Sequence, residues 1–346
     1  MSALPAPSPA SRPRLGLLGL GWIGKRRLEA LLASGVAEVV GLADSERAAA
    51  EQARQLSPTA HVAKNLDDLL SMDLDGVVIA TPSALHAEQS VAALERGLAV
   101  FCQKPLGRDA AETRRVVDAA RAADRLLDVD LCYRRTDAIQ KVRDAVRSGS
   151  LGRTFAAELV FHNAYGPDKP WFYERRLSGG GCVVDLGIHL VDLALWTLDF
   201  PAVLSVTARV FAGGEPLAPD SDRVEDYAEA RLDLQGGVVA RIACSWRLHA
   251  GRDAVIEAAF YGTEGGAAMR NVAGSFVDFA AERFRGTSRQ TLSAPPDDWG
   301  GRTIVEWARR VAAGERFCSD AERLVDVASV LDAISVRREL GARGGR

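Results

Sequence analysis

The feature that most constrains the fold is a glycine-rich stretch near the start of the chain. Residues 14–20 form a short apolar run that leads into Gly19-Leu20-Gly21-Trp22-Ile23-Gly24, and a helical pattern continues to Leu32. Glycines in such a turn let backbone amides and the positive end of a helix approach a pyrophosphate. The order strand, turn and helix predicts a dinucleotide-binding unit, although a glycine-rich turn without a ligand would give the same local pattern.

The second apolar run, residues 38–43, ends in Asp44. In dinucleotide-binding folds an acid about twenty residues past the first glycine accepts hydrogen bonds from the ribose hydroxyls and repels a 2′-phosphate. The sequence therefore predicts that NAD is preferred over NADP. Ser45 and Arg47 lie close enough to soften that discrimination, so NADP stays open.

Alternation of strands and helices continues to residue 132, which predicts an α/β Rossmann domain with a doubly wound parallel sheet over residues 14–132. The preceding segment, 1–13, is rich in Pro, Ala and Ser and is expected to be a disordered tail. In such a sheet ligands collect at the carboxyl ends of the strands. Expected strands are 76–80, 99–102 and 126–132, and expected helices are 46–55, 66–72, 84–96 and 110–123.

Lys104 directly follows a buried strand and directly precedes Pro105. The proline restricts the backbone before it, so the lysine is expected to point into the same crevice as Gly19, Asp44 and Thr81. A dry site there would lower the pKa of the ammonium group. An ordinary loop lysine is the alternative interpretation.

Beyond residue 148 the apolar period changes to two, with charged residues interleaved. This pattern predicts an α+β domain, residues 133–346, built on a large, mostly antiparallel sheet with one face covered by helices and the other open. Apolar residues in both registers of 240–246 lead us to expect a homodimer or homotetramer formed through the open face. Expected strands are 154–163, 203–211, 224–234, 238–248 and 254–262, weaker ones are 267–271 and 275–282, and helices are expected at 302–313 and 321–340.

Residues 178–196 carry the polar groups that most need an explanation. Three glycines, 179–181, lead into a helix that is apolar nearly all round, with Asp185, His189 and Asp192 at i, i+4 and i+7 on one face. A carboxylate buried there requires a partner or a ligand. Asp185 and His189 either satisfy each other or form part of a site.

Composition limits the class of protein. The 346 residues are 47% hydrophobic and 26% charged with a formal net charge of −3, which fits a two-domain cytoplasmic protein and argues against nucleic acid as the main partner. The five cysteines show no close-spaced pair, so we expect reduced thiols and no metal site. No apolar run is expected to span a membrane.

Taken together, the motifs resemble the Gfo/Idh/MocA family of NAD(P)-dependent oxidoreductases over essentially the whole chain after residue 13. The resemblance implies a Rossmann domain with an open-faced sheet domain, and hydride transfer between NAD and a secondary alcohol or ketone of a sugar or cyclitol. It also implies that the Lys104–Pro105 bond is cis. The motifs are Gly19-Leu20-Gly21-Trp22-Ile23-Gly24, Asp44, Thr81-Pro82 with His86, Gln103-Lys104-Pro105, Tyr133-Arg134-Arg135, Trp171, and residues 179–189.

Carried over residue by residue, the resemblance makes Lys104, Asp185 and His189 the catalytic set. His189 would accept the hydroxyl proton, Lys104 would donate to the substrate oxygen, and Asp185 would orient and polarise the site. Gln103 departs from the family, which usually has glutamate there. Expected cofactor-binding residues are Gly19, Leu20, Gly21, Trp22, Ile23, Gly24, Asp44, Ser45, Thr81, Pro82, His86, Gln103 and Lys104; expected substrate-binding residues are Tyr133, Arg135, Trp171, Arg175, Asp185 and His189.

Two other functions stay open. One is a glycosidase or epimerase that reduces and reoxidises bound NAD within each turnover, so that no net NADH appears. The other is a dinucleotide-binding sensor without turnover. Relatives of that kind tend to lose the lysine and histidine, and both Lys104 and His189 are present.

Overall fold

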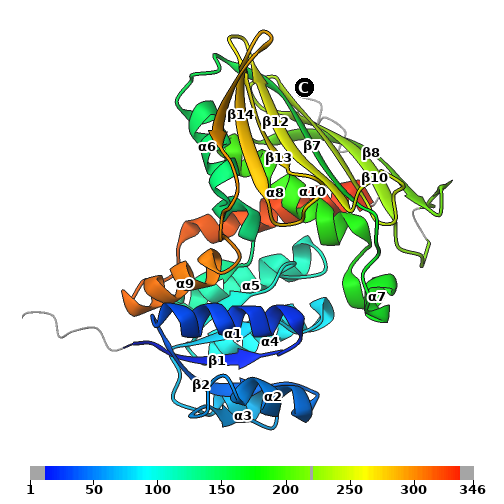
Figure 1. The fold of residues 1–346 in the computed structure, drawn as a ribbon. Coiled ribbons are helices and arrows are strands. Elements are labelled where there is room, and N and C mark those ends of the chain that lie inside the picture. Colours follow the sequence, from blue (N-terminus) through cyan, green and yellow to red (C-terminus); the bar gives the residue numbers. More distant parts are fainter. Residues whose placement is uncertain (1–11, 219–220, 336–346) are drawn as a thin grey trace, which may run out of the picture.

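The computed structural model describes residues 12–218 and 221–335, which form two sheets with helices between and around them (Figure 1). The first sheet has six strands in the order β3-β2-β1-β4-β5-β6, and all of them are parallel, so the predicted parallel sheet is confirmed. Its central strands are buried at every residue because helices cover both faces. The strands are β1 (Arg14–Leu18), β2 (Glu38–Ala43), β3 (His61–Val62), β4 (Gly76–Ile79), β5 (Ala99–Cys102) and β6 (Leu127–Val129).

Five helices connect these strands, namely α1 (Trp22–Ser34), α2 (Arg47–Arg54), α3 (Leu66–Leu70), α4 (Ser83–Glu95) and α5 (Ala110–Ala123). The predicted bounds agree closely except at the last strand. Strand β6 ends at Val129 rather than at residue 132, because Cys132–Arg135 form a short 3₁₀ turn that leads into the second domain. Strand β3 was not predicted, since two residues carry no measurable period.

The second sheet has nine strands in the order β15-β14-β13-β12-β7-β11-β10-β8-β9. All neighbours are antiparallel except β7 and β11, so the prediction of a mostly antiparallel sheet is confirmed. The strands are β7 (Thr154–Asn163), β8 (Val203–Ala212), β9 (Glu215–Pro216), β10 (Tyr227–Leu234), β11 (Val238–Ser245), β12 (Ala254–Gly262), β13 (Gly266–Asn271), β14 (Phe279–Arg285) and β15 (Ser288–Ser293).

The predicted strand 275–282 is displaced towards the C-terminus, because its first residues form a turn. The Ser275 hydroxyl bonds to the Asp278 carboxylate at 2.9 Å and accepts from the Val277 amide at 3.1 Å, so β14 begins only at Phe279. Strand β15 was missed because it is polar and almost fully exposed, which leaves no apolar alternation to detect.

Three helices cover the inner face of this sheet: α6 (Asp137–Arg147), α8 (Ile188–Thr197), which continues a π-helical turn at Val183–Gly187, and α10 (Arg323–Ser335) (Figure 1). The stretch Arg175–Thr197 is long and apolar enough to cross a membrane by length and composition alone, but 83% of its most apolar window is buried inside the protein. The predicted helix 321–340 is described only up to Ser335. The opposite face of the sheet has no helix on it among the described residues, and a homo-oligomer formed through it stays a prediction.

Helix α9 (Arg302–Ala312) follows the second sheet in the chain but packs on the first. Its Trp307 is 0% exposed, with its ring 5.6 Å from that of Phe101, and a Cβ on Gly76 would lie 2.9 Å from the indole. The chain therefore passes between the two sheets three times, after β6, before α9 and again between α9 and α10.

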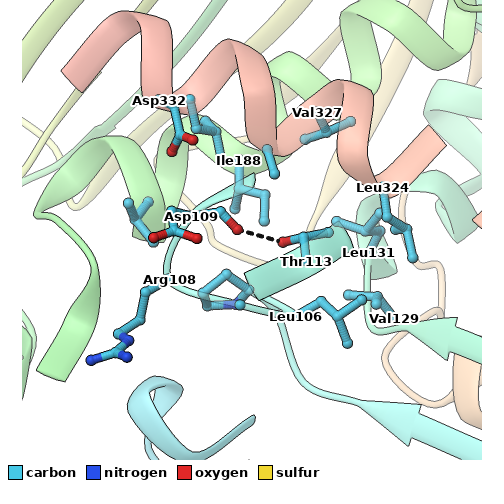
Figure 2. A pocket seen from close by; sticks show the side chains of 15 residues that line it. Leu106, Arg108, Asp109, Thr113, Val129, Leu131, Ile188, Leu324, Val327 and Asp332 are labelled. Atoms are coloured by element: carbon cyan, nitrogen blue, oxygen red, sulfur yellow. Dashed lines mark hydrogen bonds between the residues drawn. The ribbon is translucent and has the colours of Figure 1, made fainter. Parts of the chain in front are cut away.

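The two domains meet around α10, α8 and the loop after β5. Figure 2 shows this junction, which is lined by Leu106 and Val327 among others and where Thr113 donates to the Asp109 carbonyl oxygen at 2.9 Å. The cavity left there measures only about 20 Å³, close to the space of a single water molecule. This junction is therefore filled by packed side chains, and the cavities large enough for a ligand lie elsewhere in the protein.

Candidate active site

A crevice of about 750 Å³ opens at the carboxyl ends of β1, β2, β4 and β5, beneath the π-helical turn. This is the edge of a parallel sheet where ligands are expected. The structure brings most of the predicted residues into its wall: Gly19, Gly21, Trp22, Ile23, Asp44, Ser45, Thr81, Pro82, His86, Gln103, Lys104, Trp171, Asp185 and His189.

The glycines of the first turn have different tasks. Gly19 has φ +87° and lies against the backbone of Ala80, while a Cβ on Gly24 would lie 2.0 Å from the Gly19 carbonyl oxygen. Both positions require glycine for packing. A Cβ on Gly21, in contrast, would meet nothing within 4 Å, so its missing side chain keeps the crevice open at the N-terminus of α1. This arrangement fits a dinucleotide pyrophosphate.

Leu20 and Gly24 were predicted to bind cofactor, but neither lines the crevice. The Leu20 side chain is buried in the core, and its amide donates to the Asp44 carboxylate at 2.6 Å. Asp44 also accepts from the Glu46 amide at 2.8 Å, so its carboxylate is fixed at the ribose end of the crevice. Lys64 lies in the same part of the wall and was not predicted, because the strand before it is only two residues long.

Lys104 reaches across from the first domain to the second. Its ammonium group donates to the Asp185 carboxylate oxygen Oδ1 and to the Asp185 carbonyl oxygen, both at 2.7 Å. The other carboxylate oxygen accepts from the indole N–H of Trp246 at 3.0 Å. Asp185 is thus satisfied by Lys104 and Trp246 rather than by His189. Trp246 was missed as a site residue because it ends an apolar run that reads as sheet packing.

His189 lies beside this pair with its imidazole 5% exposed. Burial, and secondarily the charge of Lys104, lowers the pKa of His189 well below its usual value of 6.5. The ring of Tyr133 packs edge-on against it at 4.8 Å. The free protein therefore holds a neutral imidazole near pH 7, which is the form that can accept a proton.

Asp192 does not share the crevice with Asp185 and His189, contrary to the helical spacing. It is buried and bonded to Arg134, with one contact of 2.8 Å. Asp192 and His189 lie in the same α-helix, but the Asp192 carboxylate is taken by Arg134 of the 3₁₀ turn Cys132–Arg135. Asp185 lies before this helix, in the π-helical turn at Val183–Gly187.

The close approach at the start of that turn depends on Gly181 and Glu225. A Cβ on Gly181 would lie 1.9 Å from the Glu225 carbonyl oxygen. The buried Glu225 carboxylate accepts from the amides of Gly181 at 2.8 Å and Val183 at 3.0 Å, and burial raises its pKa. These contacts anchor the turn that carries Asp185. Sequence reasoning missed Glu225 because no local pattern links it to the glycine run.

The loop around Lys104 is held from two sides. His86 bridges the carbonyl oxygens of Pro105 at 2.6 Å and Thr81 at 2.7 Å; burial lowers its pKa, and a neutral ring donates to only one of them at a time. The Lys104–Pro105 bond is cis, as the resemblance implied.

Gln103 belongs to a buried polar cluster with Asp130 and Arg27. Its amide nitrogen bonds to the Asp130 carboxylate, whose same oxygen accepts from Arg27 Nε at 2.5 Å. The Arg27 guanidinium also bonds to the Gly300 carbonyl oxygen in the second domain. A negative charge is therefore present beside position 103, on Asp130 rather than on residue 103 itself.

A second cavity of about 1410 Å³ adjoins the crevice and shares Lys104 and His189 with it. Of the predicted substrate residues, Tyr133 and Arg135 line this second cavity, whereas Arg175 lines neither one. Trp171 is stacked on Phe172 at 3.8 Å in the crevice wall. Within the described ranges, no group of three His, Cys, Asp or Glu side chains could hold a metal ion.

Two protein-family models match the chain, one for each domain. Residues 14–131 match the model of an oxidoreductase family with an NAD-binding Rossmann fold, and residues 139–268 match the GFO/IDH/MocA C-terminal domain. The chain belongs to the Gfo/Idh/MocA family. The predicted family and fold class are confirmed.

Characterised members of the Gfo/Idh/MocA family resemble the chain over most of its length. It is 29% identical to D-glucoside 3-dehydrogenase of Escherichia coli (strain K12) over 67% of this chain and 69% of that one. It is 30% identical to 1,5-anhydro-D-fructose reductase of Ensifer adhaerens over 75% and 76%. Levoglucosan dehydrogenase in complex with NADH and levoglucosan has the same fold, with a TM-score of 0.82, 21% identity and coverage of 95% and 99%. Other structures of this fold contain NAD or NADP.

Two glycines of the first turn should respond differently to alanine. Gly21→Ala adds a methyl group where the crevice is open, so it should leave the melting temperature nearly unchanged and weaken NAD binding about tenfold or more. Gly24→Ala forces the helix away from the Gly19 carbonyl and should destabilise the protein by roughly 1–3 kcal/mol. Thermal unfolding and NAD titration by fluorescence measure both. Equal loss of stability in the two variants would contradict this assignment.

Positions 103 and 130 should accept one amide and one carboxylate in either order, but not two carboxylates. Gln103→Glu alone places two acceptors against each other in a buried site and should cost roughly 2–4 kcal/mol of unfolding free energy. Adding Asp130→Asn restores one amide and one carboxylate and should recover at least half of that loss. Urea unfolding of the two single variants and the double variant tests the pair; strictly additive losses would show that the two side chains do not interact.

Proposed function

We propose that this chain transfers a hydride between NAD and a secondary alcohol or ketone of an uncharged sugar or cyclitol. The observation that carries the proposal is the position of Lys104 and His189, which line both the dinucleotide crevice and the second cavity. A substrate in the second cavity would meet both side chains. The similarity to D-glucoside 3-dehydrogenase and 1,5-anhydro-D-fructose reductase supports the substrate class.

The side chains have complementary capacities for this reaction. Bound NAD supplies the hydride acceptor. An ammonium group has three N–H donors, and Lys104 uses two of them on Asp185, which leaves one for the substrate oxygen. Neutral His189 accepts the hydroxyl proton during oxidation, and in reduction the proton moves the other way.

The charges of the second cavity favour an uncharged substrate. Five of the six basic side chains in its wall already form ion pairs with carboxylates. Arg309 is the one for which the described ranges give no ion pair. A nucleotide diphosphate or a sugar acid would need several free donors there. The paired side chains are Arg26, Arg27, Lys104, Arg135 and Arg302.

A substrate panel tests the proposal. Neutral glycosides, anhydrosugars, inositols, sugar acids and nucleotide sugars are each offered with NAD, and NADH is followed by absorbance together with product by chromatography. We expect equimolar NADH and ketone from at least one neutral polyol. Product without net NADH would instead identify a glycosidase or epimerase, and binding of NAD without any product would favour a sensor.

Loss of Lys104 or His189 should affect turnover and spare cofactor binding. The pyrophosphate and ribose ends of the crevice lie with Gly21 and Asp44, so Lys104→Ala and His189→Ala should change the Kd of NAD little. Each should lower kcat/KM by about 10²-fold or more, and the double variant should lose less than the product of the two, because both act on one proton transfer. Parallel loss of NAD binding would mean that these side chains maintain the fold instead.

The fixed carboxylate of Asp44 supports a preference for NAD. Both of its oxygens are held by backbone amides, so it cannot turn away from a 2′-phosphate. We expect kcat/KM to be at least about tenfold higher with NAD than with NADP, and Asp44→Ser to reduce that ratio. Lys64, in the same wall, is the residue to substitute if the wild-type protein prefers NADP, which would contradict this proposal.

A further inference from the structure

Trp246 is the only tryptophan among the described residues whose indole N–H donates to a carboxylate. Its N–H donates to the Asp185 carboxylate at 3.0 Å while Lys104 binds the second oxygen of the same group. The side chain is 3% exposed, so this bond forms away from bulk water. In such surroundings a hydrogen bond to a charged acceptor is stronger than one between neutral groups.

The position of the indole is set independently of Asp185. The Trp246 amide donates to the Asp226 carbonyl oxygen at 2.8 Å, and the rings of Phe172 and Tyr173 pack against the indole at 6.4 and 5.6 Å. The next residue, Arg247, has φ +56° and its guanidinium lies over the Tyr173 ring at 5.2 Å. The indole is therefore held by its place directly after β11 and by Phe172 and Tyr173, which lie in the segment before the glycine run 179–181.

One segment fixes both sides of the carboxylate. Glu225 anchors the amides at the start of the π-helical turn, and the adjacent Asp226 anchors the backbone of Trp246. The segment that carries Asp185 and the backbone of its indole donor are thus positioned by hydrogen bonds to two adjacent residues, Glu225 and Asp226. A small shift of either one would lengthen the bond between them.

We propose that Trp246 is a positioning residue for the hydride-transfer reaction: its indole N–H fixes the Asp185 carboxylate in the orientation that leaves one Lys104 donor directed at the substrate oxygen. Without the indole N–H, the carboxylate is free to rotate and to take Lys104 with it. The inference rests on the proposed function, since it concerns the lysine that faces the substrate.

Trp246→Phe removes the donor and keeps an aromatic ring. With the neutral substrate found in the panel, kcat should fall about ten- to a hundredfold while the Kd of NAD changes by less than about twofold. Trp307→Phe is the matched control, because it makes the same chemical change at a buried indole whose N–H has no partner among the described residues. We expect it to retain kcat.

A double-mutant cycle separates positioning from general packing. If Trp246 acts through the carboxylate, Trp246→Phe should add little to the loss already caused by Asp185→Ala. Multiplicative losses, or equal effects of Trp246→Phe and Trp307→Phe on kcat, would overturn the proposal.

A second readout does not depend on turnover. The indole N–H resonance of Trp246, assigned in a ¹⁵N-labelled sample by its disappearance in Trp246→Phe, should shift in Asp185→Ala and shift less in His189→Ala. If no panel substrate reacts, the proposed function fails on its own, and an unshifted resonance in Asp185→Ala would still refute the placement of the indole.

Discussion

The ion pair between Lys104 and Asp185 is the contact on which the rest of the site depends. It joins the loop after β5 in the first domain to the π-helical turn under the second sheet, with both contacts to the lysine at 2.7 Å. Neither partner is fully buried, and an ion pair of this kind contributes little to stability by itself. Its importance is geometric, because it sets the lysine at the point where two cavities meet. Glu225 and His86 each hold one of the two segments in place.

The same apolar surroundings serve packing and chemistry. The helix that carries His189 is buried on nearly every side, which stabilises the second domain and removes water from the imidazole. Burial lowers the pKa of His189, so the packing that stabilises the domain also keeps a neutral base there. At Glu225 burial raises the pKa, and the amide hydrogen bonds from Gly181 and Val183 oppose that rise and hold the carboxylate in place. Moving the helix outward would expose the imidazole and also reduce the apolar packing of the second domain.

The parts of the structure that could be predicted from the sequence are those with a clear local pattern of apolar residues or glycines. Strands β4 and β5 are continuous apolar runs, β7 alternates, and the turn before α1 has the glycine spacing of a dinucleotide site, so the two domains and most crevice residues could be inferred. Trp246 and Glu225 could not, because their partners lie about 40 to 60 residues away in the chain and leave no local signal. Asp192 was misplaced because its partner, Arg134, lies 58 residues away in the chain and gives no local signal. The polar edge strand β15 has no alternation to detect.

Besides the segment 313–322 that leads from α9 back to α10, two links tie the domains together covalently. One link is the 3₁₀ turn Cys132–Arg135, and the other is the segment before Arg302, where Arg27 bonds to the Gly300 carbonyl oxygen. Both links line the second cavity, the first through Cys132 and Arg135 and the second through Gly300 and Arg302. The segments that connect the domains are therefore also part of the wall of this cavity, so a substitution in either segment changes the connection and the cavity together.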